Sequence, residues 1–226
     1  MKIGLLLSGN GVYDGAEIHE AVLTMLAIEE MGWQSVCIGI NKPQHHVINH
    51  LSGTEMQETR NMLVEAARIA RGKIQDIVNI EAADLDALVI PGGFGSAKNF
   101  TTWAFDGPNS TILPEVKLLL VNLVNVGKPI VALCVSPVVL AKAFEGSSIK
   151  PSLSLGTSKD ASPYDIAGFH QGIESIGAHA EERAITECII DYNNRIICAP
   201  CYMMEASILE VRTNIKLALE HLKALL

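Results

Sequence analysis

The chain has 226 residues, a formal net charge of −8 and 49% hydrophobic residues. A chain of this length buries roughly 70% of its unfolded surface, so it can form a core without disulfides or structural metals. No basic cluster is present, which disfavours binding to nucleic acid or to anionic membranes. No apolar run is long enough to cross a bilayer. The five cysteines are an odd number, which argues against a disulfide framework.

The first apolar run, residues 2–8, predicts a buried strand. It ends too early for the hydrophobic region of a signal peptide, so we expect a cytoplasmic protein. The glycine loop at 9–15 does not match the dinucleotide-binding fingerprint. A helix over 16–31 and a strand over 35–40 follow, and together with the first strand they predict a right-handed βαβ unit.

Residues 41–72 are more polar than their surroundings and predict a helical insertion within a single domain spanning 1–226. The helix in this insertion is expected over roughly 55–71. His46 and His50 are four residues apart and could share one helix face around a metal ion. With no third ligand evident in the sequence, we favour a surface or packing role and expect no metal.

A strand is predicted over 85–90, and it leads directly into Pro91-Gly92-Gly93. Glycines in such a turn allow backbone N–H groups to approach a ligand closely. A helix over 111–126 comes next. The apolar, β-branched run 130–134 then predicts a strand buried on both faces of a parallel sheet.

Cys134 ends this strand, and Ser136-Pro137 can begin a helix immediately afterwards. A cysteine in that turn would lie at the carboxyl edge of the sheet, where open α/β sheets bind ligands. The N-terminus of the helix would also favour a thiolate. A buried, inert cysteine that ends a core strand is an equally good interpretation of this segment alone.

The C-terminal part predicts a helix over 164–176, a hairpin from 187–191 and 195–198, and a closing helix over 204–226. Strands and helices therefore alternate along most of the chain. This order predicts an α/β fold with a doubly wound, mostly parallel sheet, helices on both faces and an added β-hairpin.

Several segments carry a resemblance to a known family. The segments are Ser8–Val22, Val47–Leu51, Glu58–Asn61, Pro91–Asn99, Leu155–Thr157 and Ala199–Met203, together with the turn at Cys134. They resemble the ThiJ/PfpI superfamily, whose flavodoxin-like fold is like that of the class I glutamine amidotransferase domain. The similarity extends to one branch, the enhancing-lycopene-biosynthesis (ElbB-type) proteins.

The resemblance implies a role for each matching residue. Cys134 matches the nucleophile, and Glu17 matches the carboxylate that lies against its sulfur. Gly92, Gly93 and the N–H of Val135 match the donors that bind an oxyanion and the substrate. It also implies a glyoxalase that needs no cofactor and converts small dicarbonyls such as glyoxal to glycolate. A homodimer and a link to isoprenoid biosynthesis are further implications.

One departure from the family bears on the reaction. Many relatives have a histidine directly after the cysteine, where this chain has Val135. Cysteine proteases and amidotransferases need a Cys–His pair, so both activities are disfavoured. His179 and Glu181 imitate the downstream amidotransferase motif, but we expect them at the periphery.

Glu17 then remains as the acid–base partner predicted from the sequence, although it could instead cap its helix. The alternative function is a non-catalytic protein that senses oxidants or binds partners through the same oxidisable cysteine.

Overall fold

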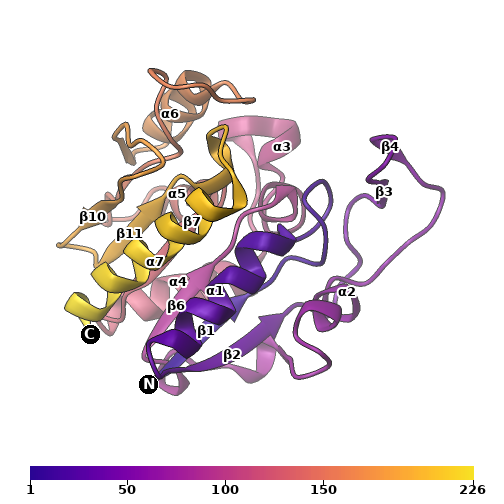
Figure 1. Cartoon of the computed structure of the whole chain (residues 1–226), viewed down its shortest axis with the longest axis horizontal. Coiled ribbons are helices and arrows are strands. Elements are labelled where there is room, and N and C mark those ends of the chain that lie inside the picture. The colour runs from indigo at the N-terminus through magenta and orange to yellow at the C-terminus, as the bar shows by residue number, and fades with distance from the viewer.

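The computed structural model describes residues 1–226 and contains a seven-stranded sheet in the order β10-β11-β7-β6-β1-β2-β5 (Figure 1). Its strands are β1 (Lys2–Leu6), β2 (Gln34–Gly39), β5 (Gln75–Asp76), β6 (Ala87–Ile90), β7 (Ile130–Leu133), β10 (Ile189–Asp191) and β11 (Ile196–Ala199). All neighbouring strands are parallel except the β10–β11 hairpin. The predicted doubly wound, mostly parallel sheet with an added hairpin is confirmed.

Helices cover both faces of this sheet. They are α1 (Ile18–Glu30), α2 (Met62–Ile69), α3 (Trp103–Asp106), α4 (Pro114–Asn125), α5 (Pro137–Phe144), α6 (Ile166–Ser175) and α7 (Ile208–Leu225). In Figure 1, α1 and α7 lie side by side in front of the sheet, while α4 and α5 lie behind it. No helix is long and apolar enough to cross a membrane.

Short elements complete the chain. Two small sheets are formed by β3 (Ile48–Asn49) with β4 (Thr54–Glu55) and by β8 (Ser152–Leu153) with β9 (His179–Ala180). Five short helical turns are η1 (Ile77–Asn79), η2 (Ala82–Asp84), η3 (Ser96–Phe100), η4 (Gly107–Asn109) and η5 (Cys201–Met203).

The core is one cluster of 57 buried residues. Every residue of β6 and β7 is buried, as expected for central strands of a parallel sheet with helices on both faces. The apolar, β-branched residues of β6 and β7 thus keep these strands in the centre of the sheet. The loops that follow them lie at its carboxyl edge.

The helix predicted over 55–71 is wrong at its start. Residues 48–55 form the β3–β4 hairpin, which projects from the body in Figure 1, and α2 begins at Met62. Asn61 sets this boundary because its side chain accepts a hydrogen bond from the N–H of Val64. Met62 and Ala66 are buried, so α2 packs on the sheet as the crossover between β2 and β5.

Candidate active site

Three loops meet at the carboxyl edge of the sheet. They follow the neighbouring parallel strands β1, β6 and β7. Strand order reverses here, since β2 lies on one side of β1 and β6 and β7 lie on the other. Open α/β sheets bind ligands at such a reversal. The sheet therefore brings together the start of α1, the Pro91-Gly92-Gly93 turn and Cys134.

Cys134 occupies a strained turn between β7 and α5. Its φ angle is 57°, in the left-handed region that a residue with a side chain adopts at a cost of about 1–3 kcal/mol. The turn is held by its own N–H, which donates to the Ala199 carbonyl at 2.9 Å. On its other side, the Ser136 hydroxyl donates to the Ile90 carbonyl at 2.9 Å. Cys134 is 6% exposed.

Glu20 is the carboxyl group in contact with this thiol. It is fully buried in the first turn of α1. One carboxyl oxygen accepts the Gly92 N–H at 2.8 Å, and the other accepts the Tyr202 N–H at 3.2 Å. The carboxyl group also lies next to the Cys134 sulfur, since a Cβ on Gly92 would meet both at 2.7 Å, and the two groups shift each other's pKa. A three-sided cage therefore orients Glu20 towards the sulfur.

Glu17, which the resemblance placed against the sulfur, has a different position. It is the residue before α1, and its carboxylate accepts the backbone N–H of Glu20 at 2.7 Å. This is the helix-capping contact considered as an alternative from the sequence. A part for Glu17 in catalysis stays a prediction.

The sequence contains a signal for Glu20 that pattern reading missed. Glu20 shares the buried face of α1 with Ala21, Thr24 and Ala27. An acidic residue on an apolar helix face is rarely buried unless it has specific partners.

The predicted N–H donors divide into two kinds. The backbone N–H groups of Gly93 and Val135 act on the sulfur of Cys134 and lower the pKa of its thiol. The N–H of Gly92 donates to Glu20 instead, so it orients the carboxyl group rather than facing the sulfur. Gly92 is nevertheless required, because a Cβ there would lie 2.7 Å from the sulfur of Cys134 and 2.7 Å from Glu20 Oε2.

Burial controls the protonation of this pair. It raises the pKa of Glu20 to about 8, and the nearby Glu17 charge adds to the effect. Burial also raises the pKa of the Cys134 thiol well above its usual value, and an ionised Glu20 raises it further, against the two N–H donors. Glu20 is therefore mostly protonated at neutral pH, and the pair holds at most one negative charge. The favourable helix N-terminus expected from the sequence does not outweigh burial.

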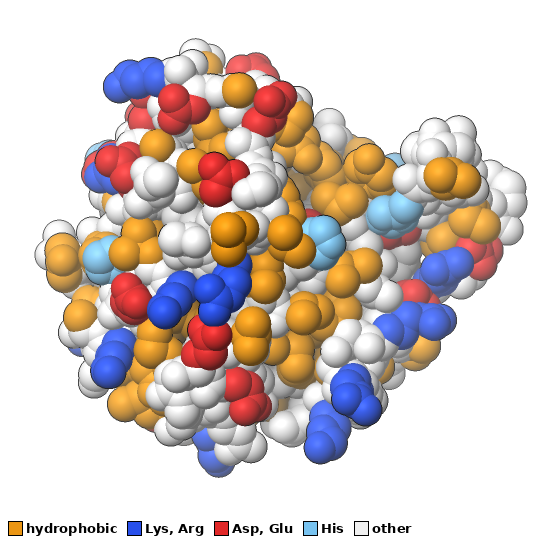
Figure 2. All heavy atoms as spheres, in the orientation of Figure 1, with side chains coloured by type: hydrophobic (Ala, Val, Ile, Leu, Met, Phe, Trp, Pro, Cys, Tyr) orange, Lys and Arg blue, Asp and Glu red, His pale blue; other side chains and the backbone are white.

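A pocket of about 520 Å³ lies beside the Cys134–Glu20 pair. Neither residue of the pair lines it, but Glu17 and Tyr202, which both contact Glu20, do. Its polar lining consists of Tyr13, Glu17, His19, Tyr164, Tyr202 and Glu205. The face shown in Figure 2 is hollowed beside the N-terminal end of α1, where this pocket lies.

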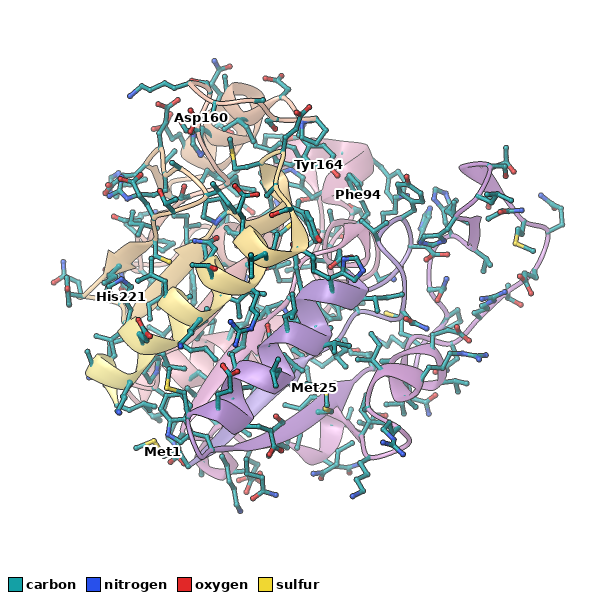
Figure 3. All side chains as sticks on the ribbon, viewed as in Figure 1. Met1, Met25, Phe94, Asp160, Tyr164 and His221 are labelled. Atoms are coloured by element: carbon teal, nitrogen blue, oxygen red, sulfur yellow. The ribbon has the colours of Figure 1, made fainter.

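Two tyrosines connect the pocket to the pair. Burial together with the charges of Cys134 and Glu20 raises the pKa of Tyr164 to about 12, which places its hydroxyl near the thiol. Figure 3 shows Tyr164 beside Phe94, and their ring centroids are 5.7 Å apart. The Tyr202 hydroxyl lies 2.9 Å from His19 Nδ1, and the Tyr202 backbone binds Glu20.

The remaining histidines of the sequence analysis lie elsewhere. His179 is exposed in β9, outside the seven-stranded sheet. His50 Nε2 accepts the N–H of Tyr13 at 3.2 Å, and His46 packs edge-on against Phe105. No group of three or more His, Cys, Asp or Glu side chains is arranged to hold a metal ion.

Two curated proteins are similar to this chain in sequence. A human protein, glutamine amidotransferase-like class 1 domain-containing protein 3, mitochondrial, is 37% identical over 92% of this chain and 76% of its own length. The rat ES1 protein homolog, mitochondrial, is 35% identical over 95% of this chain and 80% of its own length. Both names place those proteins in mitochondria, so the cytoplasmic location expected for this chain stays a prediction. No protein-family model matches the chain.

Solved structures agree with the fold. An isoprenoid biosynthesis protein with an amidotransferase-like domain from Ehrlichia chaffeensis is 34% identical, covers all of both chains and has a TM-score of 0.89. Glyoxalase III from Candida albicans has a TM-score of 0.60 over 99% of this chain and 97% of its own. At 16% identity, that second similarity concerns the fold alone.

Proposed function

We propose that this chain is a cysteine-dependent enzyme that converts small dicarbonyls to 2-hydroxy acids. The chain belongs to the glutamine amidotransferase-like class 1 (ES1 and ElbB-type) branch of the ThiJ/PfpI superfamily. The observation that carries the proposal is the strained Cys134 turn, in which Glu20 and two backbone N–H groups surround one sulfur next to a pocket. Strain and a shifted pKa at one residue in a cleft are typical of functional sites. The expected link to isoprenoid biosynthesis is supported by the name of the Ehrlichia relative.

The first step uses the form of the pair from which one of its two protons has left, so that one negative charge and one proton remain. The sulfur of Cys134 adds to an aldehyde carbon of the substrate, and the proton held between Cys134 and Glu20 moves to the resulting oxygen. The product is a hemithioacetal, and Glu20 is left as a carboxylate. The N–H groups of Gly93 and Val135, which already act on the sulfur, would stabilise charge that develops on that oxygen.

The second step moves a proton between neighbouring carbons. A carboxylate takes the proton from the carbon bonded to sulfur and returns it to the adjacent carbonyl carbon, which gives a 2-hydroxy thioester. We assign this carboxylate to Glu20, whose pKa of about 8 suits a group that both takes and gives a proton near neutral pH. Water then hydrolyses the thioester and restores the thiol. The sum is glyoxal plus water giving glycolic acid.

Loss of Cys134 tests the proposal directly. Cys134→Ser is expected to reduce glycolate formation from glyoxal to background, because a serine hydroxyl cannot form the thioester intermediate. Cys188→Ser is the matched control, since Cys188 is a partly exposed thiol on another part of the molecule. Glycolate should be quantified by chromatography, because any thiol removes dicarbonyls reversibly without forming this product. Equal glycolate formation in wild type and Cys134→Ser would contradict the proposal, and no glycolate from either would favour the redox-sensing alternative.

A homodimer also remains a proposal, supported by the family resemblance and by the hydrophobic content of 49%. Light scattering of the purified protein at micromolar concentration is expected to give twice the mass of 24.3 kDa. A mass equal to one chain over that range would refute the dimer.

A further inference from the structure

We propose that the pocket beside Cys134, which Glu17 and Tyr202 connect to the Cys134–Glu20 pair, selects carbonyl compounds that carry a protonated amine and excludes those that carry a carboxylate or phosphate. This inference rests on the proposed cysteine chemistry and adds the charge of the substrate to it. It follows from two observations. The charged side chains that line the pocket are acidic, and they form no ion pairs.

The pocket lining is acidic. Glu17 and Glu205 both line it, whereas no lysine or arginine does. Neither glutamate takes part in an ion pair in the structure. Glu17 is 8% exposed, and the backbone N–H of Glu20 is its hydrogen-bond donor. A carboxylate this buried without a nearby cation is unfavourable, and a cationic group in the pocket would compensate it.

Lys98 contacts Tyr13 but does not supply that compensation. It donates to the backbone carbonyl of Tyr13 at 2.8 Å, and its Nζ lies 5.6 Å from the centre of the Phe94 ring. The charges of Asp14 and Glu55 act on Lys98, and it forms no ion pair with either glutamate of the pocket.

The aromatic lining fits a cation as well. Tyr13, Tyr164 and Tyr202 all border the same space, and the faces of aromatic rings attract ammonium groups. The tyrosine hydroxyls and the His19 ring add hydrogen-bonding groups, and the Tyr202 hydroxyl lies 2.9 Å from His19 Nδ1. The lining has no lysine or arginine to bind a carboxylate or phosphate.

The size of the pocket argues for a substrate larger than glyoxal. A volume of about 520 Å³ is within the range of roughly 300–1,000 Å³ that accommodates drug-sized ligands. Glyoxal has four heavy atoms and would leave most of this space to water. The remainder can hold an amine-bearing group attached to the reactive carbonyl.

The test compares two thiol reagents that differ in charge. Trimethylammonium-ethyl methanethiosulfonate is a cation, and sulfonatoethyl methanethiosulfonate is an anion. With either reagent the thiolate attacks the reagent's sulfenyl sulfur, a mixed disulfide forms and methanesulfinate leaves. The rate of modification at Cys134 would be followed by peptide mass spectrometry at about 0.1 M salt. The same ratio of rates in the guanidinium-unfolded chain provides the intrinsic reference.

In the folded protein, we expect the ratio of cationic to anionic rates at Cys134 to exceed the unfolded reference by about tenfold. Glu205→Gln should lower this ratio by roughly threefold. Glu220→Gln removes another exposed glutamate and should leave the ratio of rates unchanged. Glu220 lies twelve residues after Ile208 on α7, which is about 18 Å along the helix axis. That distance exceeds the screening length of about 10 Å at 0.1 M salt.

Each other outcome has a separate meaning. If Cys134 reacts with both reagents at the unfolded ratio, the charge selectivity is overturned while the proposed nucleophile stands. An equal effect of Glu205→Gln and Glu220→Gln would assign the selectivity to net charge and overturn the pocket. If neither reagent modifies Cys134 in the folded protein but both do in the unfolded chain, the proposed function itself fails.

Discussion

Glu20→Gln is expected to lower turnover of glyoxal by roughly a hundredfold or more, whereas Glu17→Gln should retain most of it. The two changes are chemically identical and lie three residues apart at the start of α1. Glu20→Gln therefore removes the carboxyl group that contacts the sulfur, whereas Glu17→Gln removes a neighbouring carboxyl group that does not. Steady-state kinetics with glycolate as the measured product, at matched concentrations of folded protein, would compare them.

The cage around Glu20 explains why glutamine is a poor substitute. Both carboxyl oxygens accept a backbone N–H, one from Gly92 and one from Tyr202. A protonated carboxyl group accepts both bonds and can still donate its O–H to the Cys134 sulfur. Glutamine has a single acceptor oxygen, so its NH₂ group would face one of the two N–H donors. The loss of one buried hydrogen bond costs about 1–3 kcal/mol.

A pH titration of stability provides a second readout for Glu20. Its pKa is raised from 4.5 to about 8 in the folded protein, so between these values the native state binds more protons than the unfolded state. The free energy of unfolding contributed by this group is present below about pH 4.5 and falls as pH rises towards 8. In denaturant titrations, Glu20→Gln should remove this dependence, whereas Glu17→Gln should reduce it only in part, because burial is the larger cause of the shift.

The reverse ranking would overturn this assignment. If Glu17→Gln abolishes turnover and Glu20→Gln keeps it, Glu17 carries the proton as the family resemblance implied. If both variants retain full turnover while Cys134→Ser has none, neither carboxylate is the base, and the second step of the mechanism is wrong.

The sequence alone predicts the architecture of this site but not its proton carrier. The apolar runs that become β6 and β7 are unambiguous, and Ser136-Pro137 marks the turn at Cys134. The choice between Glu17 and Glu20 depends on where α1 begins. An expected start at Ala16 places Glu17 inside the helix, whereas the observed start at Ile18 makes it the cap. Pattern reading does not resolve a boundary to two residues.

A similar limit applies to the region before α2. The stretch from Glu55 to Asn61 has too few apolar residues to bury a helix face. The apolar periodicity that begins after it leads to a predicted helix that starts too early. The side chain of Asn61 decides the boundary through one hydrogen bond to Val64. Likewise, the N–H of Gly92 donates to Glu20 and not to a substrate. The two residues are 72 positions apart in the sequence, so no local pattern predicts this hydrogen bond.

Gly93→Ala is expected to lower the free energy of unfolding by about 2–5 kcal/mol, which combines a positive-φ cost of about 1–2 with overpacking of about 1–3. Gly93 has a φ angle of 92°, and a Cβ there would lie 2.4 Å from the Glu17 nitrogen and 2.4 Å from the Gly15 carbonyl oxygen. Both contacts are to backbone, so no side-chain rotation relieves them. The adjacent Gly92 carbonyl accepts the Glu17 N–H at 3.0 Å, so the clash would also separate the start of α1 from the loop after β6.

Gly32→Ala is the matched control for this change. Gly32 has a φ angle of 71° and no atom within 4 Å of its added Cβ, so it measures the cost of positive φ without a steric contact. Thermal unfolding should place Gly32→Ala about 2–8 °C below wild type and Gly93→Ala roughly 4–20 °C below it, with Gly93→Ala the lower of the two because of its overpacking. Where Gly93→Ala is still folded, glycolate formation should also fall, because Gly93 supplies one of the two N–H donors at the sulfur. Equal melting temperatures for the two variants would mean that the Gly93 turn does not press against the start of α1, and the alignment of Glu20 with Cys134 would need another cause.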